Sequence, residues 1–312
     1  MSIEEKDSAQ SFETHRGHLT GLAYRMLGSL AEAQDVVQEA YLRWHRARGR
    51  ETVEDPRAFL SRTVTRLCLD QLKSARARRE VYVGPWLPEP VLDPDSLATG
   101  TATEYAHDLS VALMLTLERL SPPERAAFLL HDVFDMDFEE VAGALGRTAD
   151  SCRQLAARAR AKVRASRPRF RTSPEQCERL AAAFGAAVRS GDAQTIAALL
   201  ARDATYYSDG GGKITSALRP ITGRDKIARL LASLSRKTLL AHTQLRPSRI
   251  NGLPGFIVEL PTGLLFTAAI DFRDGLIANI YLVGNPDKLR HVSRDPLVTP
   301  ANLRERRETG KH

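Results

Sequence analysis

Cysteine is scarce in this chain: its 312 residues include three cysteines, Cys68, Cys152 and Cys177, which lie far apart. An odd and widely spaced set provides no disulfide framework, and the sequence contains no CxxC pair and no Cys/His cluster with metal-ligand spacing. We therefore expect a reducing compartment, no disulfide bonds and no metal site.

Long hydrophobic runs are missing as well. No apolar stretch approaches the roughly 20 residues that a transmembrane helix needs, and the opening residues, MSIEEKDSAQ, are too polar and acidic for a signal peptide. With 43% hydrophobic and 27% charged residues, the composition indicates a soluble globular protein with room for two or three domains. We expect a cytoplasmic protein that does not contact a membrane.

Two common catalytic motifs are also missing. The sequence has no GxSxG elbow, and its glycine-rich stretch DGGGK, Asp209–Lys213, is not a phosphate-binding P-loop. That loop would need Gly in place of Tyr207 and Ser or Thr in place of Ile214.

Positive charge is plentiful. The formal net charge is +7 and the isoelectric point is about 9.5, which favours an anionic partner. The basic residues concentrate in two stretches, 56–79 and 147–171, and this distribution is more informative than the sign of the total charge.

Residues 138–164 are predicted to form two short helices joined by a tight turn. Asp137 caps the first helix, Gly146 ends it in the left-handed conformation, and Thr148 caps the second. The outer face of the second helix carries residue types that read bases and phosphates: Arg153, Gln154, Arg158 and Arg164. These residues favour a DNA-recognition helix, with a helical hairpin that has a solvated basic face as the alternative.

A second basic helix is predicted to begin at Asp55-Pro56. Only Asp70 and Glu80 oppose its positive side chains, which are Arg57, Arg62, Arg66, Lys73, Arg76, Arg78 and Arg79. Such asymmetry favours phosphate contact, although arginine near a helix end is also favoured by the helix dipole. The presence of two such patches strengthens the nucleic-acid interpretation.

The segments around these helices suggest a domain order. Residues 12–47 look helical, with a break at Gly28 and an outer face of mixed charge that the residues alone identify as a solvated face. Residues 81–107 contain four prolines, so they form a linker and not one helix, and Trp86 in its WLPEP stretch is expected to dock onto a domain. A second helical module spans 108–168.

Beyond residue 173 the pattern changes. Helical stretches are followed by alternating or apolar runs, which are separated by turns at Asn251-Gly252, Thr262-Gly263 and Asp274-Gly275. This order predicts an α+β domain over 173–290, with an antiparallel curved sheet over helices, followed by a flexible tail over 291–312. The chain is thus expected to be multidomain, with two all-α modules followed by an α+β domain.

The helical half resembles the extracytoplasmic-function sigma factors of the sigma-70 family. AYRMLGSLAEAQDVVQEAYLRW and FLSRTVTRLCLDQLKSARARRE look like sigma region 2 (residues 1–80), and LERLSPPERAAFLLHDVFDMDFEEVAGALGRTADSCRQLAARARAKVR looks like region 4 (108–168). WLPEP, DGGGK and NPDKL (Asn285–Leu289) match a subgroup with a fused C-terminal SnoaL-like, cone-shaped NTF2-type domain. The resemblance implies a factor that binds core RNA polymerase and directs promoter-specific initiation.

The resemblance also implies roles for single residues. The side of region 2 that would dock on core polymerase carries Asp35, Gln38 and Glu39, which revises the solvated-face interpretation. Contacts to the −10 element and its separated strand would come from Arg57, Arg62, Arg66 and Lys73. The −35 element would be read by Arg147, Ser151, Arg153, Gln154, Arg158 and Arg160.

The fused domain is expected to regulate the sigma modules in place of a separate anti-sigma protein, through contacts within the chain. Its regulatory and interdomain residues would be Trp86, Asp209, Gly210, Gly211, Gly212, Lys213, Asn285, Pro286, Asp287, Lys288 and Leu289. Lys213 and Lys288 are expected to meet the acidic residues that precede the recognition helix. We expect no enzyme activity, no cofactor and no catalytic residue.

The alternative for this domain is that it binds or isomerises a small ligand. SnoaL relatives include cyclases that use an acidic residue in the cone, and candidates for such a role here are Asp209, His242 and Asp271, with Tyr206 and Tyr207 nearby. No base with an orienting partner can be paired from the sequence, so a binding or docking module is favoured.

Overall fold

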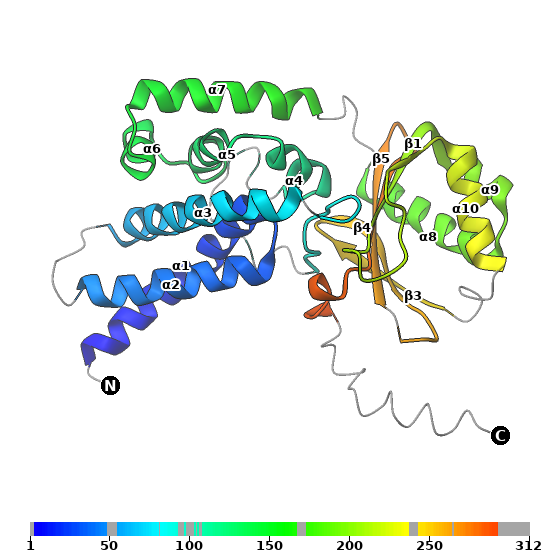
Figure 1. Ribbon diagram of the computed structural model, residues 1–312, viewed down its shortest axis with the longest axis horizontal. Coiled ribbons are helices and arrows are strands. Elements are labelled where there is room, and N and C mark those ends of the chain that lie inside the picture. Colours follow the sequence, from blue (N-terminus) through cyan, green and yellow to red (C-terminus); the bar gives the residue numbers. More distant parts are fainter. Residues whose placement is uncertain are drawn as a thin grey trace. The chain divides into compact units, whose positions relative to one another are not determined.

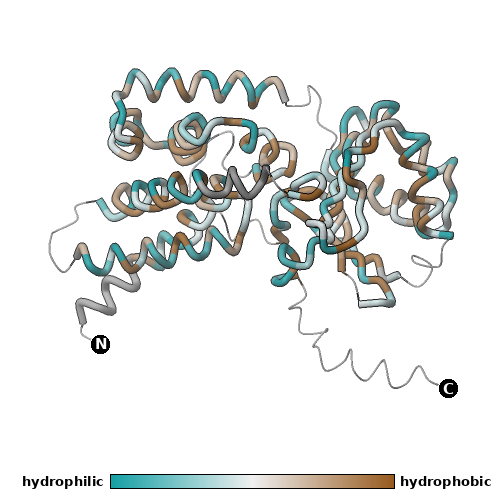
Figure 2. Tube along the Cα trace, in the orientation of Figure 1, coloured by the Kyte–Doolittle hydropathy of each residue, from teal (hydrophilic) through white to brown (hydrophobic). Residues whose placement is uncertain are grey.

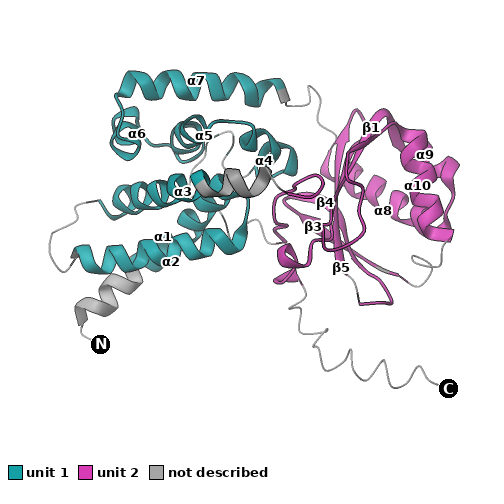
Figure 3. Ribbon diagram, in the orientation of Figure 1, with its two compact units in different colours: residues 1–81, 93–167 teal, residues 82–92, 168–312 magenta. Residues whose placement is uncertain are grey.

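A computed structural model describes residues 3–48, 55–80, 82–92, 97, 103, 105, 108–166, 173–236, 243–263 and 265–292. The chain divides into two compact units (Figure 3). Unit 1 comprises residues 1–81 and 93–167, and unit 2 comprises residues 82–92 and 168–312.

Unit 1 begins with three helices, α1 (Ile3–Leu27), α2 (Leu30–Arg48) and α3 (Pro56–Glu80) (Figure 1). Gly28 separates the first two with a positive φ of 71°, and Ser29 caps α2 by accepting a hydrogen bond from the Glu32 N–H at 3.2 Å. Trp44 is fully buried in the core that the three helices share. The predicted break at Gly28 and the predicted helix start at Pro56 are confirmed, whereas the first helix begins at Ile3 and not at residue 12.

The described part of unit 1 continues with α4 (Val111–Glu118), α5 (Pro122–Phe128), a π-helical turn (Leu129–Val133), α6 (Phe138–Leu145) and α7 (Ala149–Ser166). Asp137 and Glu140 form a capping box at the start of α6, and Gly146 ends it with φ 63°, as predicted. The sequence did not predict the π-helical turn, in which the Phe134 N–H donates to Leu129 O at 2.9 Å.

The two helical groups pack into one body. Arg125 of α5 is 3% exposed and donates to Met26 O of α1 at 2.5 Å and to Glu118 at 3.0 Å. From the other side, the Arg25 guanidinium lies 5.6 Å from the ring centroid of Phe134. The two modules expected from the sequence therefore form a single unit, held in part by buried arginines.

Unit 2 is a six-stranded sheet with helices α8 (Pro174–Ser190), α9 (Ala193–Leu199) and α10 (Arg224–Arg236). Its strands are β1 (Leu200–Asp209), β2 (Ile221–Thr222), β3 (Gln244–Ile250), β4 (Leu253–Glu259), β5 (Leu265–Arg273) and β6 (Leu276–Val283), in the order β2-β1-β6-β5-β4-β3. The hairpins from β3 to β6 are antiparallel, as predicted. The sheet as a whole is mixed, because β1 pairs with β6 in parallel, which corrects the all-antiparallel expectation.

The core of unit 2 lies between the helices and one face of the sheet. Phe184 of α8, Ile196 of α9 and Ile227 of α10 pack with Phe256 and Ile280 of the sheet in one buried cluster. Apolar and polar residues alternate along the helices of both units (Figure 2), which is the pattern expected of helices that bury one face.

The expected linker is divided between the units. Residues 82–92 belong to unit 2, whereas Leu97 and Tyr105 are buried, at 3% and 4% exposure, in unit 1. The expected linker 81–107 thus contributes residues to both units, and the expected domain boundaries 173–290 stay a prediction. Val292 is also 3% exposed, so unit 2 continues into the expected tail, of which residues 293–312 lie outside the described part.

Candidate functional site

Helix α7 buries and exposes the two sets of residues that its sequence periodicity predicts. Thr148 caps the helix by accepting from the Ser151 N–H at 3.3 Å, and Cys152 and Val163 are fully buried. Arg147, Arg153, Gln154 and Arg158 are exposed, and Ser151 is half-buried. One side of α7 thus packs in unit 1 while four of the six predicted −35 residues face outward.

Arg160 differs from the other predicted −35 residues. Its Nε lies 2.9 Å from Asp132 Oδ1, and the two side chains are 32% and 15% exposed. Burial raises the pKa of Asp132, against the opposing charge of Arg160. This ion pair ties α7 to the π-helical turn, which leaves Arg160 directed toward its own module.

The predicted −10 residues lie along α3, where Arg57, Arg62, Arg66 and Lys73 are all exposed. Two of them contact backbone carbonyls of the other helical group. Arg57 Nη2 donates to Phe134 O at 3.1 Å, and Arg66 donates to Ala144 O at 3.2 Å and to Gly143 O at 2.8 Å. Because those carbonyls lie at the C-terminal end of α6, the Arg66 charge also meets the favourable end of the helix dipole.

The predicted polymerase-binding residues share the outer side of α2. Asp35 and Gln38 are exposed, and Glu39 accepts a hydrogen bond from Arg43 at 2.9 Å. Leu42 continues this side one turn later and is 40% exposed. The side therefore presents polar groups around one exposed leucine.

Unit 2 holds the first part of the linker through Asp209, at the end of β1. This residue is 1% exposed, and its carboxylate accepts hydrogen bonds from Tyr82 Oη at 2.5 Å, the Leu87 N–H at 2.8 Å, Lys288 Nζ at 2.7 Å and the Gly211 N–H at 3.1 Å. We call Asp209, Lys288, Tyr82 and Leu87 the linker clasp.

Lys288 completes the linker clasp. It donates to Leu87 O at 2.5 Å, and its Nζ lies 4.5 Å from the ring centroid of Trp86 and 5.0 Å from that of Tyr82. Burial, followed by the hydrogen bond to Asp209, raises the pKa of Tyr82 well above its usual value. The linker backbone and its aromatic rings thus enclose one ion pair.

Close packing explains the glycines of DGGGK. Gly211 has φ 60°, and a Cβ there would lie 2.2 Å from Asn285 Nδ2. Asn285 donates to Tyr82 Oη at 2.9 Å, so the DGGGK turn, the NPDKL segment and the linker meet at one point. Lys213 pairs with Asp287 at 2.5 Å and Lys288 with Asp209. Both lysines thus have carboxylate partners within unit 2, and their expected contact with the acidic residues ahead of the recognition helix stays a prediction.

A second set of contacts holds the end of this linker segment. Val91 and Asn251 exchange two hydrogen bonds, at 3.1 Å and 2.7 Å. His291 Nε2 lies 2.7 Å from Pro90 O, while its Nδ1 lies 3.2 Å from Glu89 Oε1 without hydrogen-bond alignment. The roles of Tyr82, Asn251 and His291 were not predictable from the sequence, because pairing across such sequence distances leaves no local signal.

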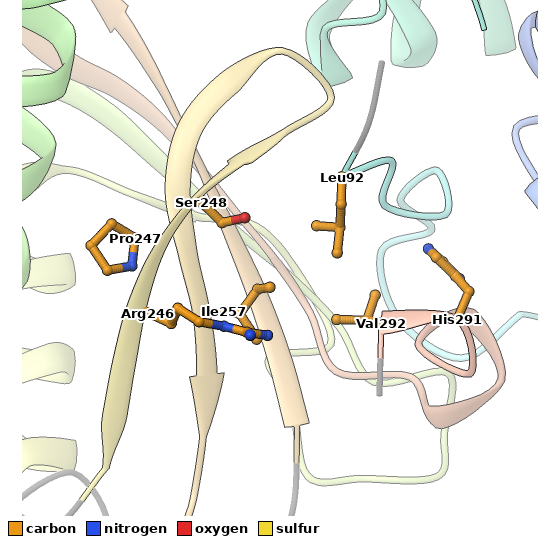
Figure 4. A pocket seen from close by; sticks show the side chains of 7 residues that line it. All are labelled: Leu92, Arg246, Pro247, Ser248, Ile257, His291 and Val292. Carbon is orange, nitrogen blue, oxygen red and sulfur yellow. The ribbon is translucent and has the colours of Figure 1, made fainter. Parts of the chain in front are cut away.

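A cavity of about 350 Å³ adjoins these contacts (Figure 4). Its walls come from the outer side of β3 and β4, from the end of the clasped linker and from the last described residues, and they are Leu92, Arg246, Pro247, Ser248, Ile257, His291 and Val292.

Of the residues considered for cone chemistry, Tyr206 and Asp209 lie on opposite faces of the sheet. Tyr206 belongs to the core between sheet and helices, and burial raises its pKa to about 12. Because side chains alternate along a strand, Asp209 lies on the opposite face, against the linker, which overturns its placement in the cone. Asp271 accepts from Asn279 at 2.9 Å, Tyr207 stacks on Tyr281, and His242 lies outside the described residues.

Membrane-spanning helices and metal-binding clusters are both absent from the described residues. Within these ranges, no helix is both long and apolar enough to span a membrane. The same part of the chain contains no group of three His, Cys, Asp or Glu side chains that could hold a metal ion.

Comparison with known proteins identifies the two helical groups of unit 1. Residues 11–78 match the family Sigma-70 region 2, and residues 110–163 match Sigma-70, region 4. The ECF RNA polymerase sigma factor SigJ of Mycobacterium tuberculosis is 39% identical over 308 residues, with 95% of each chain covered. The probable ECF RNA polymerase sigma factor SigI of the same species is 31% identical over 304 residues, with 95% of this chain and 98% of SigI covered.

The crystal structure of SigJ superposes with a TM-score of 0.72 at 37% identity, covering 90% of this chain and 98% of that one. The match includes the α+β unit, so the expected fold class, helical sigma modules followed by a SnoaL-like domain, is confirmed. The chain belongs to the extracytoplasmic-function RNA polymerase sigma factors, which bind core RNA polymerase and direct initiation at specific promoters.

Proposed function

We propose that unit 2 is a built-in regulator of this sigma factor and that it acts on the linker between regions 2 and 4. The observation that carries the proposal is the buried Asp209 carboxylate, which accepts a backbone hydrogen bond from Leu87 and pairs with Lys288. A buried carboxylate with its charge paired and its lone pairs occupied is stable only while all partners stay in place. The linker segment 82–92 and the rest of unit 2 therefore associate or separate cooperatively.

The arrangement of unit 1 gives this regulator a target. The −10 and −35 elements lie about 25 base pairs apart, or about 85 Å along B-DNA at 3.4 Å per base pair. The longest helices of unit 1 have 25 residues, or about 38 Å at 1.5 Å per residue, so a body in which Arg57 holds Phe134 and Arg66 holds α6 is too short for that distance. We infer that unit 1 is a resting form that opens on promoter binding and that the linker clasp biases this opening.

The DNA contacts follow from the exposed groups. Arg147, Arg153, Gln154 and Arg158 of the region 4 surface suit base edges and phosphates of the −35 element, and Ser151 suits a phosphate. Arg160 instead supports α7 through Asp132. On α3, Arg62 and Lys73 are available to the −10 element in the resting form, and Arg57 and Arg66 after opening.

The outer side of α2, with Asp35, Gln38 and Glu39, is the proposed docking surface for core polymerase. Because the factor acts on polymerase, we place it in the cytoplasm. No catalysis is assigned to unit 2, because Asp209 is occupied by the clasp and the other acidic candidate, Asp271, is bonded to Asn279.

Run-off transcription with core polymerase tests the regulator. The full chain is compared with Asp209→Asn, which keeps the side-chain shape but removes the charge, and with a chain lacking residues 285–312. Asp203→Asn is the control, because its ion pair with Arg273 lies on the exposed surface of unit 2, outside the clasp. We expect Asp209→Asn and the truncation to change promoter output in the same direction and the control to have no effect. Unchanged output from both altered chains would refute regulation by the clasp.

A second candidate, a ligand-responsive domain, has one observation in its favour. The 350 Å³ cavity has Leu92 in its wall, so a bound molecule would touch the clasped linker, and the volume is within the range of small-molecule sites. If a small molecule alters transcription through this cavity, Ser248→Leu should abolish its effect by filling the space.

A further inference from the structure

Arg153, the central residue of the proposed −35 surface, lies on top of a column of stacked side chains within unit 1. Its guanidinium carbon is 5.4 Å from the ring centroid of Phe138. Phe138 in turn stacks on His131, with ring centroids 3.9 Å apart and planes inclined by 29°. His131 Nδ1 lies 2.9 Å from Met136 O, which anchors the base of the column.

Two carboxylates hold the edges of the same guanidinium. Arg153 Nη1 donates to Asp150 Oδ1 at 2.6 Å, and Nη2 donates to Glu139 Oε1 at 3.3 Å. Asp150 lies one turn earlier on α7, whereas Glu139 belongs to α6. Both helices of the helix-turn-helix therefore orient one arginine.

Stability does not account for this arrangement. The side chains of Arg153, Glu139 and Asp150 are 50%, 71% and 87% exposed, and exposed ion pairs contribute about 0–1 kcal/mol. A carboxylate on a surface that meets DNA also repels phosphates, so both acids lower affinity for DNA of every sequence. The remaining effect of Asp150 and Glu139 is to orient the Arg153 guanidinium.

The held guanidinium keeps the donors that base reading needs. Arginine has five N–H groups, and two are used by Asp150 and Glu139. The other three include the Nε–H and one N–H on each terminal nitrogen, enough for a two-bond contact to guanine O6 and N7. A mobile arginine can turn to the nearest phosphate instead, but one stacked on Phe138 and held at both terminal nitrogens cannot do so without losing these contacts.

We infer that Phe138, Asp150 and Glu139 are positioning residues that direct Arg153 to a guanine of the −35 element and so set base specificity at one position. The inference rests on the proposed −35 role of Arg153. It assigns the three residues a function in selectivity and not in overall affinity.

One test uses full-length protein with core polymerase on promoters that carry every single-base change in the −35 element. Arg153→Ala should remove the base preference at one position. Asp150→Asn, Glu139→Gln and Phe138→Leu should each reduce the preference at that same position by about 3- to 10-fold, a part of the 1–3 kcal/mol of a bidentate contact, while the two acid variants bind all sequences more tightly. Asp150→Glu should restore part of the preference.

The control is Asp135→Asn, which removes one exposed negative charge of unit 1 outside the column. Asp135 has φ 58°, a conformation that asparagine tolerates. It should raise binding to all sequences and leave every base preference unchanged. If Asp150→Asn, Glu139→Gln and Phe138→Leu behave like this control, the inference is overturned.

A second test needs no DNA and separates the inference from the proposed role of Arg153. In full-length protein with ¹⁵N-labelled arginine, the Arg153 Nε–H resonance is assigned by its loss in Arg153→Lys, and its order parameter is measured. We expect a value typical of rigid groups in the unaltered chain and a lower one in Asp150→Asn and in Phe138→Leu. A mobile Arg153 in the unaltered chain would overturn the inference. An ordered Arg153 together with an Arg153→Ala effect that is equal on all promoters would overturn the base contact alone.

Discussion

Leu87 donates its backbone N–H to the buried carboxylate of Asp209, 122 positions further along the chain, at 2.8 Å. The same carboxylate pairs with Lys288, whose side chain is 13% exposed, while that of Asp209 is fully buried. One linker residue between the two DNA-binding modules is thus held by the charge centre of the C-terminal domain.

The first prediction concerns this charge centre. Asp209→Ala should lower the free energy of unfolding of unit 2 by about 3–5 kcal/mol, because it leaves the Lys288 charge buried without its counter-ion. It should also speed hydrogen exchange of the 82–92 amides. Chemical denaturation and exchange mass spectrometry measure the two effects. Asp287→Ala, which breaks a half-exposed pair, should cost below about 1 kcal/mol, and a similar cost for both variants would contradict the prediction.

The second prediction concerns the resting form of unit 1. Arg66→Ala removes two hydrogen bonds to the C-terminal end of α6, so the helical groups should separate more often, at a cost of about 1–3 kcal/mol for charged hydrogen bonds. Spin labels on α2 and α7 should report a larger population at long distance. Arg62→Ala is the matched control, since Arg62 lies on the same helix and has no described contact with α6. Equal distance distributions for both variants would argue against the arginine contacts.

The third prediction concerns alkaline stability. Burial raises the pKa of Tyr206 to about 12, whereas a tyrosine in the unfolded chain has a pKa near 10. The folded state therefore holds the Tyr206 proton more tightly than the unfolded chain does. The stability that this difference contributes is fully present below about pH 10 and is lost as the pH rises toward 12. Tyr206→Phe, which cannot ionise, should lose about 1–3 kcal/mol less stability between pH 9 and pH 12. Thermal melts of both proteins across this range measure the difference, and parallel declines would show that Tyr206 does not titrate in this way.

The fourth prediction compares two glycines. Gly211→Ala should destabilise unit 2 by about 1–3 kcal/mol, because the new Cβ would meet Asn285 at 2.2 Å and φ is positive. Gly143→Ala should stabilise unit 1 by about 0.5–1 kcal/mol, since Gly143 is inside α6 and nothing lies within 4 Å of a Cβ there. Denaturation midpoints of the two variants should move in opposite directions. A stabilising Gly211→Ala would show that the DGGGK turn is not tightly packed.

Local signals in the sequence were reliable where they depend on neighbours within a turn or two. The caps Asp137 and Thr148, the left-handed Gly146 and the hairpins after residue 243 all follow from such signals. The faces of α7 were predictable for the same reason, because a helix repeats every 3.6 residues.

Side-chain direction in unit 2 was less predictable. The sequence offered Asp209 both as an interdomain residue and, in the alternative, as an acidic residue of the cone, and strand alternation places it on the other face of the sheet. It gave no sign of the carboxylates that Lys213 and Lys288 meet within unit 2. Which charged partner a lysine meets depends on the chain brought beside it, and many acidic residues were available.

By itself, the sequence determined that this protein has two helical modules with basic faces, a proline-containing linker and an α+β domain, because periodicity, capping and turn residues act over short distances. Only the tertiary structure decided that β1 joins β6 in parallel, that the linker is divided at residue 92, and that Arg57 and Arg66 contact region 4. These features join residues far apart in the chain, and such contacts form only where the folded core brings two surfaces of matching shape and charge together.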